Sequence, residues 1–155
     1  MEIGEIPKLG SQCKIIHDFK PSEYRDSTAA SVSLGISAGD EKAHWFIFIG
    51  TFVGKILLKH GFFNDNNQVQ VSTAAESSQL PKVGEWTKIE ICHEKVDDKY
   101  FLSLSVGGRE VGRKEVTDPG LRNLTDVKVK LGRPQKERCQ PGFIRRLVVL
   151  EKRLD

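Results

Sequence analysis

The chain has 155 residues and a mass of 17.4 kDa, which is the size of one domain. Hydrophobic residues make up 38% and charged residues 29%, a balance that allows a buried core and excludes a disordered or membrane-embedded chain. The 24 Lys and Arg residues against 21 Asp and Glu give a net charge of +3, too small to indicate a nucleic-acid partner. We therefore predict one domain over residues 1–155 that does not bind nucleic acid.

Apolar stretches are too short for a transmembrane helix, which needs about 20 residues. The longest, from Trp45 to Leu58, is interrupted by Gly50, Gly54 and Lys55. The start of the chain, Met-Glu-Ile-Gly-Glu, lacks the basic and apolar regions of a secretory signal. We expect no membrane span and no signal peptide in this chain, and both a cytoplasmic protein and a mature extracellular fragment fit the sequence.

Short runs of β-branched and aromatic residues recur along the chain, and helical periodicity is nearly absent. At 100–106 apolar residues alternate with polar ones, and Gly107-Gly108 then suits a two-residue hairpin turn. About ten short strands joined by turns predict an all-β, antiparallel sandwich or jelly roll. In chain order, the expected strands cover residues 13–19, 30–36, 44–49, 55–58, 68–73, 84–91, 100–106, 109–116, 126–132 and 142–150.

The second half of the chain carries turns and core positions of a known superfamily. Gly84-Glu85-Trp86 precedes an alternating strand, Asp97-Asp98-Lys99 forms a turn, the next strand ends in Val106-Gly107-Gly108, and Gly142 to Leu147 closes the pattern. This arrangement, over roughly residues 81–150, resembles the laminin-G and pentraxin-like domains of the concanavalin-A-like jelly rolls. The resemblance implies the fold. Because laminin-G-like domains often bind sulfated polysaccharides, it also implies this class of ligand.

A weaker similarity links residues 56–67 to the galactoside-binding stretch of galectins, which are also jelly rolls. His60 fits the first ligand position, but Phe62 stands at the position of an Asn and Asn64 at that of an Arg. Trp86 follows Gly84-Glu85 where galectins have the tryptophan first. This similarity therefore implies the fold and no specific sugar.

Enzymatic chemistry has little support in the sequence, and we predict that the protein is not an enzyme. No Ser or Cys lies in a Gly-x-Ser-x-Gly context. Cys92 and His93 are adjacent on a strand and point to opposite faces, so we expect Cys92 in the core and His93 at the surface. Glu85 and Glu90 likewise face opposite sides, which disfavours a glycosidase pair of carboxylates.

Metal and disulfide chemistry are the remaining alternatives. Asp65 and the pair Asp97-Asp98 lie in oxygen-rich turns of a kind that calcium can use, but each turn offers only a few of the six to eight oxygens that calcium needs. We therefore favour ordinary turn chemistry and expect no cofactor, with calcium as the alternative. Three cysteines are too few for a disulfide framework. We expect reduced thiols, with one long-range bridge from Cys139 as the alternative.

Two groups of residues are candidate binding sites. The first is a polar loop beside aromatic residues, which suits hydrogen bonding to a sugar. The second is a basic patch, which forms if the strand face that carries Lys128 and Lys130, opposite Val127 and Val129, adjoins two arginines. We expect the aromatic residues Trp45, Trp86 and Tyr100 in the core. The loop comprises His60, Asn64, Asp65, Asn66 and Asn67, and the patch comprises Lys128, Lys130, Arg133 and Arg145.

We therefore predict a non-catalytic, lectin-like recognition domain that binds glycans, sulfated ones included. The alternative is a structural or protein-interaction domain that uses a sheet face or the basic patch. A homodimer through unpaired edge strands is a further prediction.

Overall fold

The computed structural model describes residues 2–9, 12–25, 31–39, 44–63, 66, 68–116, 124–132 and 139–151. Of these, the backbone alone is described at 2–9, 38–39, 44–48, 62–63, 69 and 124–126. The strands are β1 (Glu2–Leu9), β2 (Cys13–Pro21), β3 (Ser31–Gly39), β4 (His44–Phe52), β5 (Lys55–Phe63), β6 (Val69–Ser77), β7 (Thr87–Val96), β8 (Lys99–Val106), β9 (Arg109–Glu115), β10 (Leu124–Leu131) and β11 (Gly142–Glu151).

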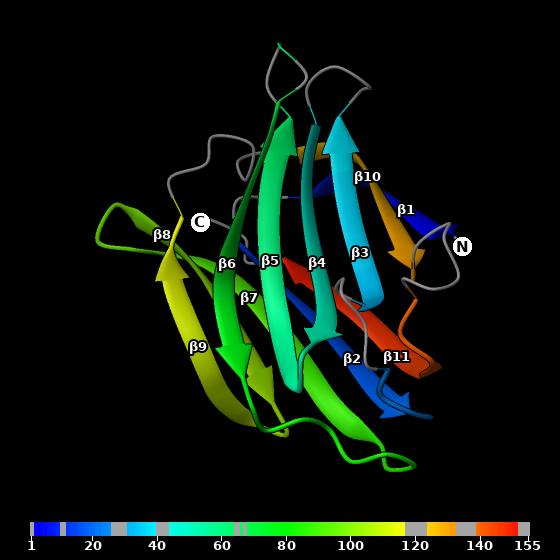
Figure 1. Ribbon diagram of the computed structural model, residues 1–155. Coiled ribbons are helices and arrows are strands. Elements are labelled where there is room, and N and C mark those ends of the chain that lie inside the picture. The colour runs from blue at the N-terminus through cyan, green and yellow to red at the C-terminus, as the bar shows by residue number, and fades with distance from the viewer. Residues whose placement is uncertain are drawn as a thin grey trace.

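The strands form two antiparallel sheets stacked face to face (Figure 1). The six-stranded sheet has the order β1-β10-β3-β4-β5-β6, and the five-stranded sheet has the order β11-β2-β7-β8-β9. Both sheets combine the two ends of the described chain, because β1 pairs with β10 and β2 pairs with β11. The expected antiparallel β-sandwich is confirmed.

Most expected strands are present, and the differences have local causes. β1 was not expected, because Gly4 and Pro7 interrupt its sequence; Pro is tolerated there because β1 lies at a sheet edge. β7 begins three residues later than expected, since Gly84 adopts a φ of +79° in a turn and donates its N–H to the Pro21 carbonyl at 2.9 Å. The hairpin turns at Asp97-Asp98 and Gly107-Gly108 have the positive φ angles of tight hairpins.

The core lies between the sheets and consists mainly of aliphatic side chains. β3 contributes Leu34 and Ile36, and β7 contributes Ile89 and Ile91, in the alternation that a half-buried strand requires. Val127 and Val129 are buried as expected. The other fully buried core positions include Ile15, Ile49, Leu58, Leu102 and Leu104.

One long edge of the sandwich is closed, because β6 packs against β9 (Figure 1). Gly112 makes this approach possible: a Cβ added there would lie 2.6 Å from the Cβ of Ala75. The Lys114 ammonium donates to the Thr73 carbonyl at 3.4 Å across the same edge. The two sheets are therefore joined at this side.

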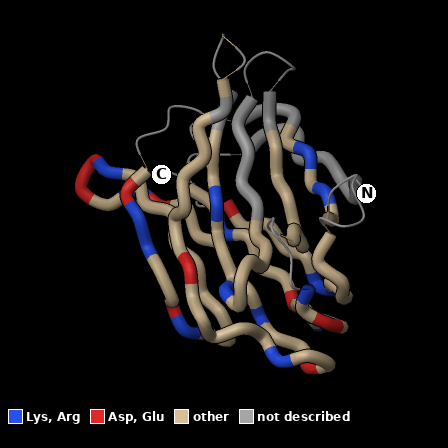
Figure 2. The backbone as a smooth tube through the Cα atoms, in the orientation of Figure 1, with Lys and Arg blue, Asp and Glu red and all other residues tan. Residues whose placement is uncertain are grey.

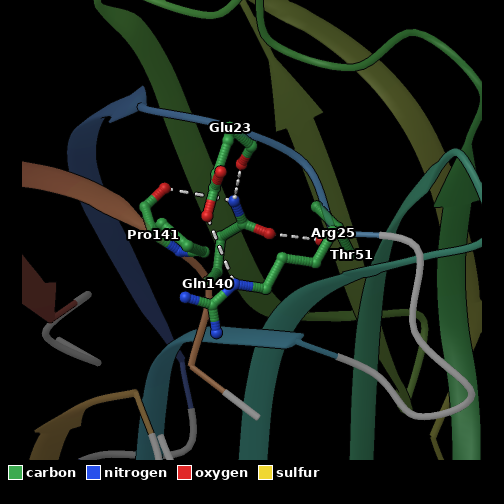
Figure 3. Close-up of polar contacts among 5 residues, drawn as sticks. All are labelled: Glu23, Arg25, Thr51, Gln140 and Pro141. Atoms are coloured by element: carbon green, nitrogen blue, oxygen red, sulfur yellow. Dashed lines mark hydrogen bonds and ion pairs between the residues drawn. The ribbon is translucent and has the colours of Figure 1, made fainter. Parts of the chain in front are cut away.

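A buried glutamine ties together three segments that are distant in sequence (Figure 3). The side-chain oxygen of Gln140 accepts a hydrogen bond from the Thr51 hydroxyl on β4. Its Nε2 donates to the Glu23 carbonyl at 2.7 Å and to the Pro141 carbonyl at 3.1 Å. Because β4 belongs to one sheet while Glu23 and Pro141 adjoin strands of the other, Gln140 links the sheets at this end.

Candidate functional site

The outer face of the six-stranded sheet follows from the register of its strands. Residues directly opposite each other in an antiparallel pair project to the same side. Leu34, Ile49 and Leu58 are paired in one row and belong to the core. The neighbouring rows therefore face outward.

Two outward rows cross the sheet from β10 to β6 and place lysines at their margins. In one, Lys130 pairs with Gly35 on β3, and Lys59 on β5 pairs with Thr73 on β6. In the other, Lys128 pairs with Ser37. The complete rows, with β4 placed by backbone register, are Lys130–Gly35–Phe48–Lys59–Thr73 and Lys128–Ser37–Phe46–Gly61–Val71.

At β3, the residues between the lysines are small, so little side chain covers the backbone there. A Cβ added to Gly35 would meet nothing nearer than the Lys130 carbonyl at 4.0 Å. Ser37 follows on the same strand, and Gly61 occupies the β5 position of the second row. We call the surface formed by Lys59, Lys128, Lys130, Gly35 and Ser37 the lysine face; Gly61 itself is buried.

The three lysines of the lysine face have no ion-pair or hydrogen-bond partner among the residues whose side chains the structure describes. Figure 2 shows basic positions on β10 and β5 of the front sheet. The backbone of β1 places Glu2 opposite Lys130 and Glu5 opposite Lys128 at the edge. Ammonium groups on one face of a sheet can bind an anionic ligand.

Lys128 and Lys130 project outward and are exposed, as expected from the alternation with Val127 and Val129. Arg133 lies outside the described residues. The structure does not bring Arg145 to these lysines, because Arg145 lies on β11 of the other sheet. The basic patch is thus divided between the two sheets.

Residues of the expected polar loop have different surroundings. His60 pairs with Ser72 in an inward-facing row and is only 7% exposed, so its ring is inside the sandwich. Asn66 is exposed in the turn between β5 and β6. Asn64, Asp65 and Asn67 lie outside the described residues.

Lys59 is a member of the lysine face that the sequence analysis missed. We expected the strand to end at Leu58, and the structure extends β5 to Phe63. The missed signal is the inward–outward alternation, which continues through Leu58, Lys59 and His60 when the histidine is counted as an inward residue.

Arg145 takes part in a cluster on the outer face of the five-stranded sheet. Its guanidinium carbon lies 4.0 Å from the centre of the Trp86 ring, and its Nε donates to Asp18 Oδ2 at 3.1 Å. The Lys20 ammonium lies 5.0 Å from the Trp86 ring centre and 5.2 Å from that of Phe143. Trp86, expected in the core, is instead half-buried beneath these cations.

The expected placement of Cys92 and His93 is reversed. His93 faces the core and stacks on Tyr100 at a centroid distance of 5.3 Å, whereas Cys92 is on the outward side beside Ser103. Burial raises the pKa of Cys92, and it raises that of Cys13 to about 12, so neither thiol is an activated nucleophile. No disulfide is present among the described residues.

No group of three His, Cys, Asp or Glu side chains that could hold a metal ion is found in the described part of the chain. In the turn between β7 and β8, Asp98 forms an ion pair with Lys95 at 3.1 Å. The search for helices long and apolar enough to cross a membrane, made on the same residues, finds none.

No protein-family profile and no curated protein matches the sequence. Solved structures do match. The botulinum neurotoxin type G receptor binding domain aligns with a TM-score of 0.61 and 10% identity, covering 96% of this chain and 39% of the toxin chain. The binding domain of Paraclostridial Mosquitocidal Protein 1 aligns with a TM-score of 0.53 and 11% identity, covering 98% and 43%.

The CBM40 domain of the Ruminococcus gnavus IT-sialidase aligns with a TM-score of 0.58 and 15% identity, covering 100% of this chain and 91% of that one. The same domain has been solved with α2,3 sialyllactose bound (TM-score 0.54). The chain has the fold of these binding domains. It is an antiparallel β-sandwich of the jelly-roll kind, and it spans about two fifths of the length of the toxin chains.

Proposed function

We propose that this protein is a non-catalytic recognition domain that binds anionic glycans, carboxylated or sulfated, on the lysine face. The observation that carries the proposal is the set of three lysines on one sheet face, none with an acidic partner among the described side chains. Unpaired ammonium groups retain their attraction for an anion, whereas paired ones must first give up a partner.

The small residues at β3 support a sugar as the ligand. A sugar ring can approach the backbone at Gly35 and Ser37, where little side chain stands in the way. The bound α2,3 sialyllactose of the similarly folded CBM40 domain is an acidic sugar. The turn at Asn66, between the end of β5 and the start of β6, can supply further hydrogen bonds at the margin of the face.

A glycan array with neutral, sialylated and sulfated members tests the proposal, at low and at physiological salt and with and without calcium. We expect binding of the acidic members alone, weakening as salt rises because the contacts are between charges. Lys128→Ala/Lys130→Ala should lose this binding. Lys88→Ala/Lys99→Ala, which removes the same charge from the other sheet, should retain it.

Two outcomes contradict the proposal. Binding of neutral sugars without salt dependence means that the lysines are not the contacts. An array without any bound member, for a protein that melts cooperatively, means that the ligand is not a glycan.

A further inference from the structure

The edge strand β11 exposes more apolar surface than a solvated sheet face needs. Phe143 is 59%, Val148 43% and Leu150 50% exposed, while Ile144, Leu147 and Val149 on the inward side pack against the core. A strand with one solvated face normally alternates apolar with polar residues. An outward row of apolar residues indicates a surface that another molecule covers.

The backbone of β11 is also available for pairing. Its N–H and C=O groups bond to β2 on one side, and no described strand pairs with the other side. By contrast, the edges at β6 and β9 pack against each other. An unpaired strand edge accepts an extended segment of another chain by main-chain hydrogen bonds.

Cations are in excess beside this edge. Asp18 Oδ2 lies 3.1 Å from the Nε of Arg145 and 3.8 Å from the Nε of Arg146. Lys20, which is opposite Phe143 in the register, adds a third positive charge. Three cations against one carboxylate leave the cluster with a charge of +2 and favour an acidic ligand.

Arg145 is held ready for such a ligand. Stacking on Trp86 and the bond from Nε to Asp18 fix the plane of its guanidinium group. Its Nη1 and Nη2 atoms have no partner among the described residues. Two adjacent guanidinium N–H groups in a fixed plane match the two oxygens of a carboxylate.

A second copy of this chain fits the edge poorly. The register shift between Arg145 and Val148, with Arg146 at a φ of +53°, interrupts the strand at its middle. Self-pairing about that point would bring the arginines of two copies together, and the one acid of the strand, Glu151, lies at its far end. Like charges brought together in this way oppose edge-to-edge association of identical sheets, whereas an acidic segment of a partner does not meet this repulsion.

We infer that β11 is a docking edge for an extended acidic and apolar segment of a partner protein. The segment adds as a strand beside β11, places a carboxylate on Nη1 and Nη2 of Arg145, and packs apolar side chains against Phe143, Val148 and Leu150. This surface belongs to the five-stranded sheet, so its occupant does not compete with a glycan on the lysine face.

Selection from a displayed library of random peptides of about ten residues, long enough to span β11, tests the inference. We expect enrichment of sequences in which acidic and apolar residues alternate. Binding of a selected peptide should weaken by about tenfold or more in Arg145→Glu and in Phe143→Ser. Arg109→Glu, the matched charge reversal on the opposite edge strand, and Lys128→Ala/Lys130→Ala should bind as the unchanged protein does.

Amide hydrogen exchange supplies a second measurement that does not depend on the variants folding equally well. The bound peptide should slow exchange at β11 and leave β9 unchanged. Peptides enriched without acidic residues, undiminished binding to Arg145→Glu, or no enrichment would each overturn the inference. The inference would also be overturned if sedimentation showed a dimer and the substitution Val148→Lys dissociated it, because a second copy of the chain would then cover the edge. If the protein binds the selected peptides but no glycan, the proposed function is overturned and this inference is not.

Discussion

The outer faces of the two sheets differ in whether their cationic side chains have acidic partners. On the five-stranded sheet, Lys88 pairs with Glu90 at 2.7 Å, and Arg113 pairs with Glu94. On the six-stranded sheet, Lys59, Lys128 and Lys130 have no acidic partner among the described side chains. Paired charges contribute to the fold and are electrically satisfied, whereas unpaired ones are available to a ligand. This difference is the reason we propose the outer face of the six-stranded sheet as the glycan-binding surface.

The largest expected effect lies on the inner side of the five-stranded sheet. Burial lowers the pKa of His17 from 6.5 to about 4, against a smaller opposing effect of Asp18, and neither ring nitrogen has a hydrogen-bond partner among the described residues. The unfolded chain therefore takes up a proton near pH 6.5 that the folded protein accepts only near pH 4. Stability should be greatest above pH 6.5 and should fall by about 3 kcal/mol between these values.

His17→Leu should remove that part of the pH dependence, measured as urea unfolding free energy at a series of pH values. The variant and the unchanged protein are compared by the slope of stability against pH, so a constant difference in packing does not matter. Parallel curves between pH 7 and 4 would contradict the prediction.

The second effect concerns the packing of the six-stranded sheet. A Cβ at Gly50 would lie 2.4 Å from the carbonyl oxygen of Ser31, so Gly50→Ala must displace backbone and should cost about 2 kcal/mol or more. Gly35→Ala on the same sheet meets no atom nearer than 4.0 Å and is the matched control, with a change within about 0.5 kcal/mol. Thermal unfolding of both variants measures the difference, and equal melting temperatures would contradict it.

The third effect separates binding from stability. Lys128→Ala/Lys130→Ala should weaken binding to a sulfated oligosaccharide by about tenfold at low salt, with a smaller difference at high salt. The melting temperature should not change, because these lysines make no described ion pair. Isothermal titration and thermal unfolding on the same samples check both statements; a large loss of stability would mean that the lysines support the fold.

The smallest effect is expected on the paired face. Arg113→Ala removes the ion pair with Glu94 and the stacking over Phe101, whose ring centre lies 5.0 Å from the guanidinium carbon. Both groups are more than a third exposed, so the loss should be at most about 1 kcal/mol. Glycan binding should be unchanged, and a variant that binds less would show that the five-stranded face also contacts the ligand.

The sandwich could be predicted from local pattern because a strand with one buried face alternates its residues. Val127 to Lys130 and the glycine hairpin at 107–108 are examples in which side-chain period and turn chemistry agree. β1 could not be predicted, since pairing with β10 at an edge stabilises a segment that contains Pro7.

The candidate site could be predicted only in part, because the alternation that predicts the strands gives no information on how the strands pair. Alternation gives the outward direction of Lys128 and Lys130 but does not say which strands adjoin them. Lys59 lies on the same sheet face as these lysines because β3 and β4 connect β5 to β10. Arg145 lies on the other sheet because β11 pairs with β2. His60 and His93 were misplaced because a histidine was treated as a surface residue, whereas both face the core.

The pairing of β1 with β10 and of β2 with β11 has a consequence for synthesis on the ribosome. Neither sheet can acquire its full set of strands until residues 124–151 have emerged, because each sheet needs a strand from that segment. During translation β2 exposes the side that β11 will cover, and β3 lacks β10. Folding dominated by such distant contacts is slow and leaves strand edges open to aggregation. A chain that stalls before residue 142 would therefore depend on chaperones, and rapid completion of the last strands would favour recovery of folded protein.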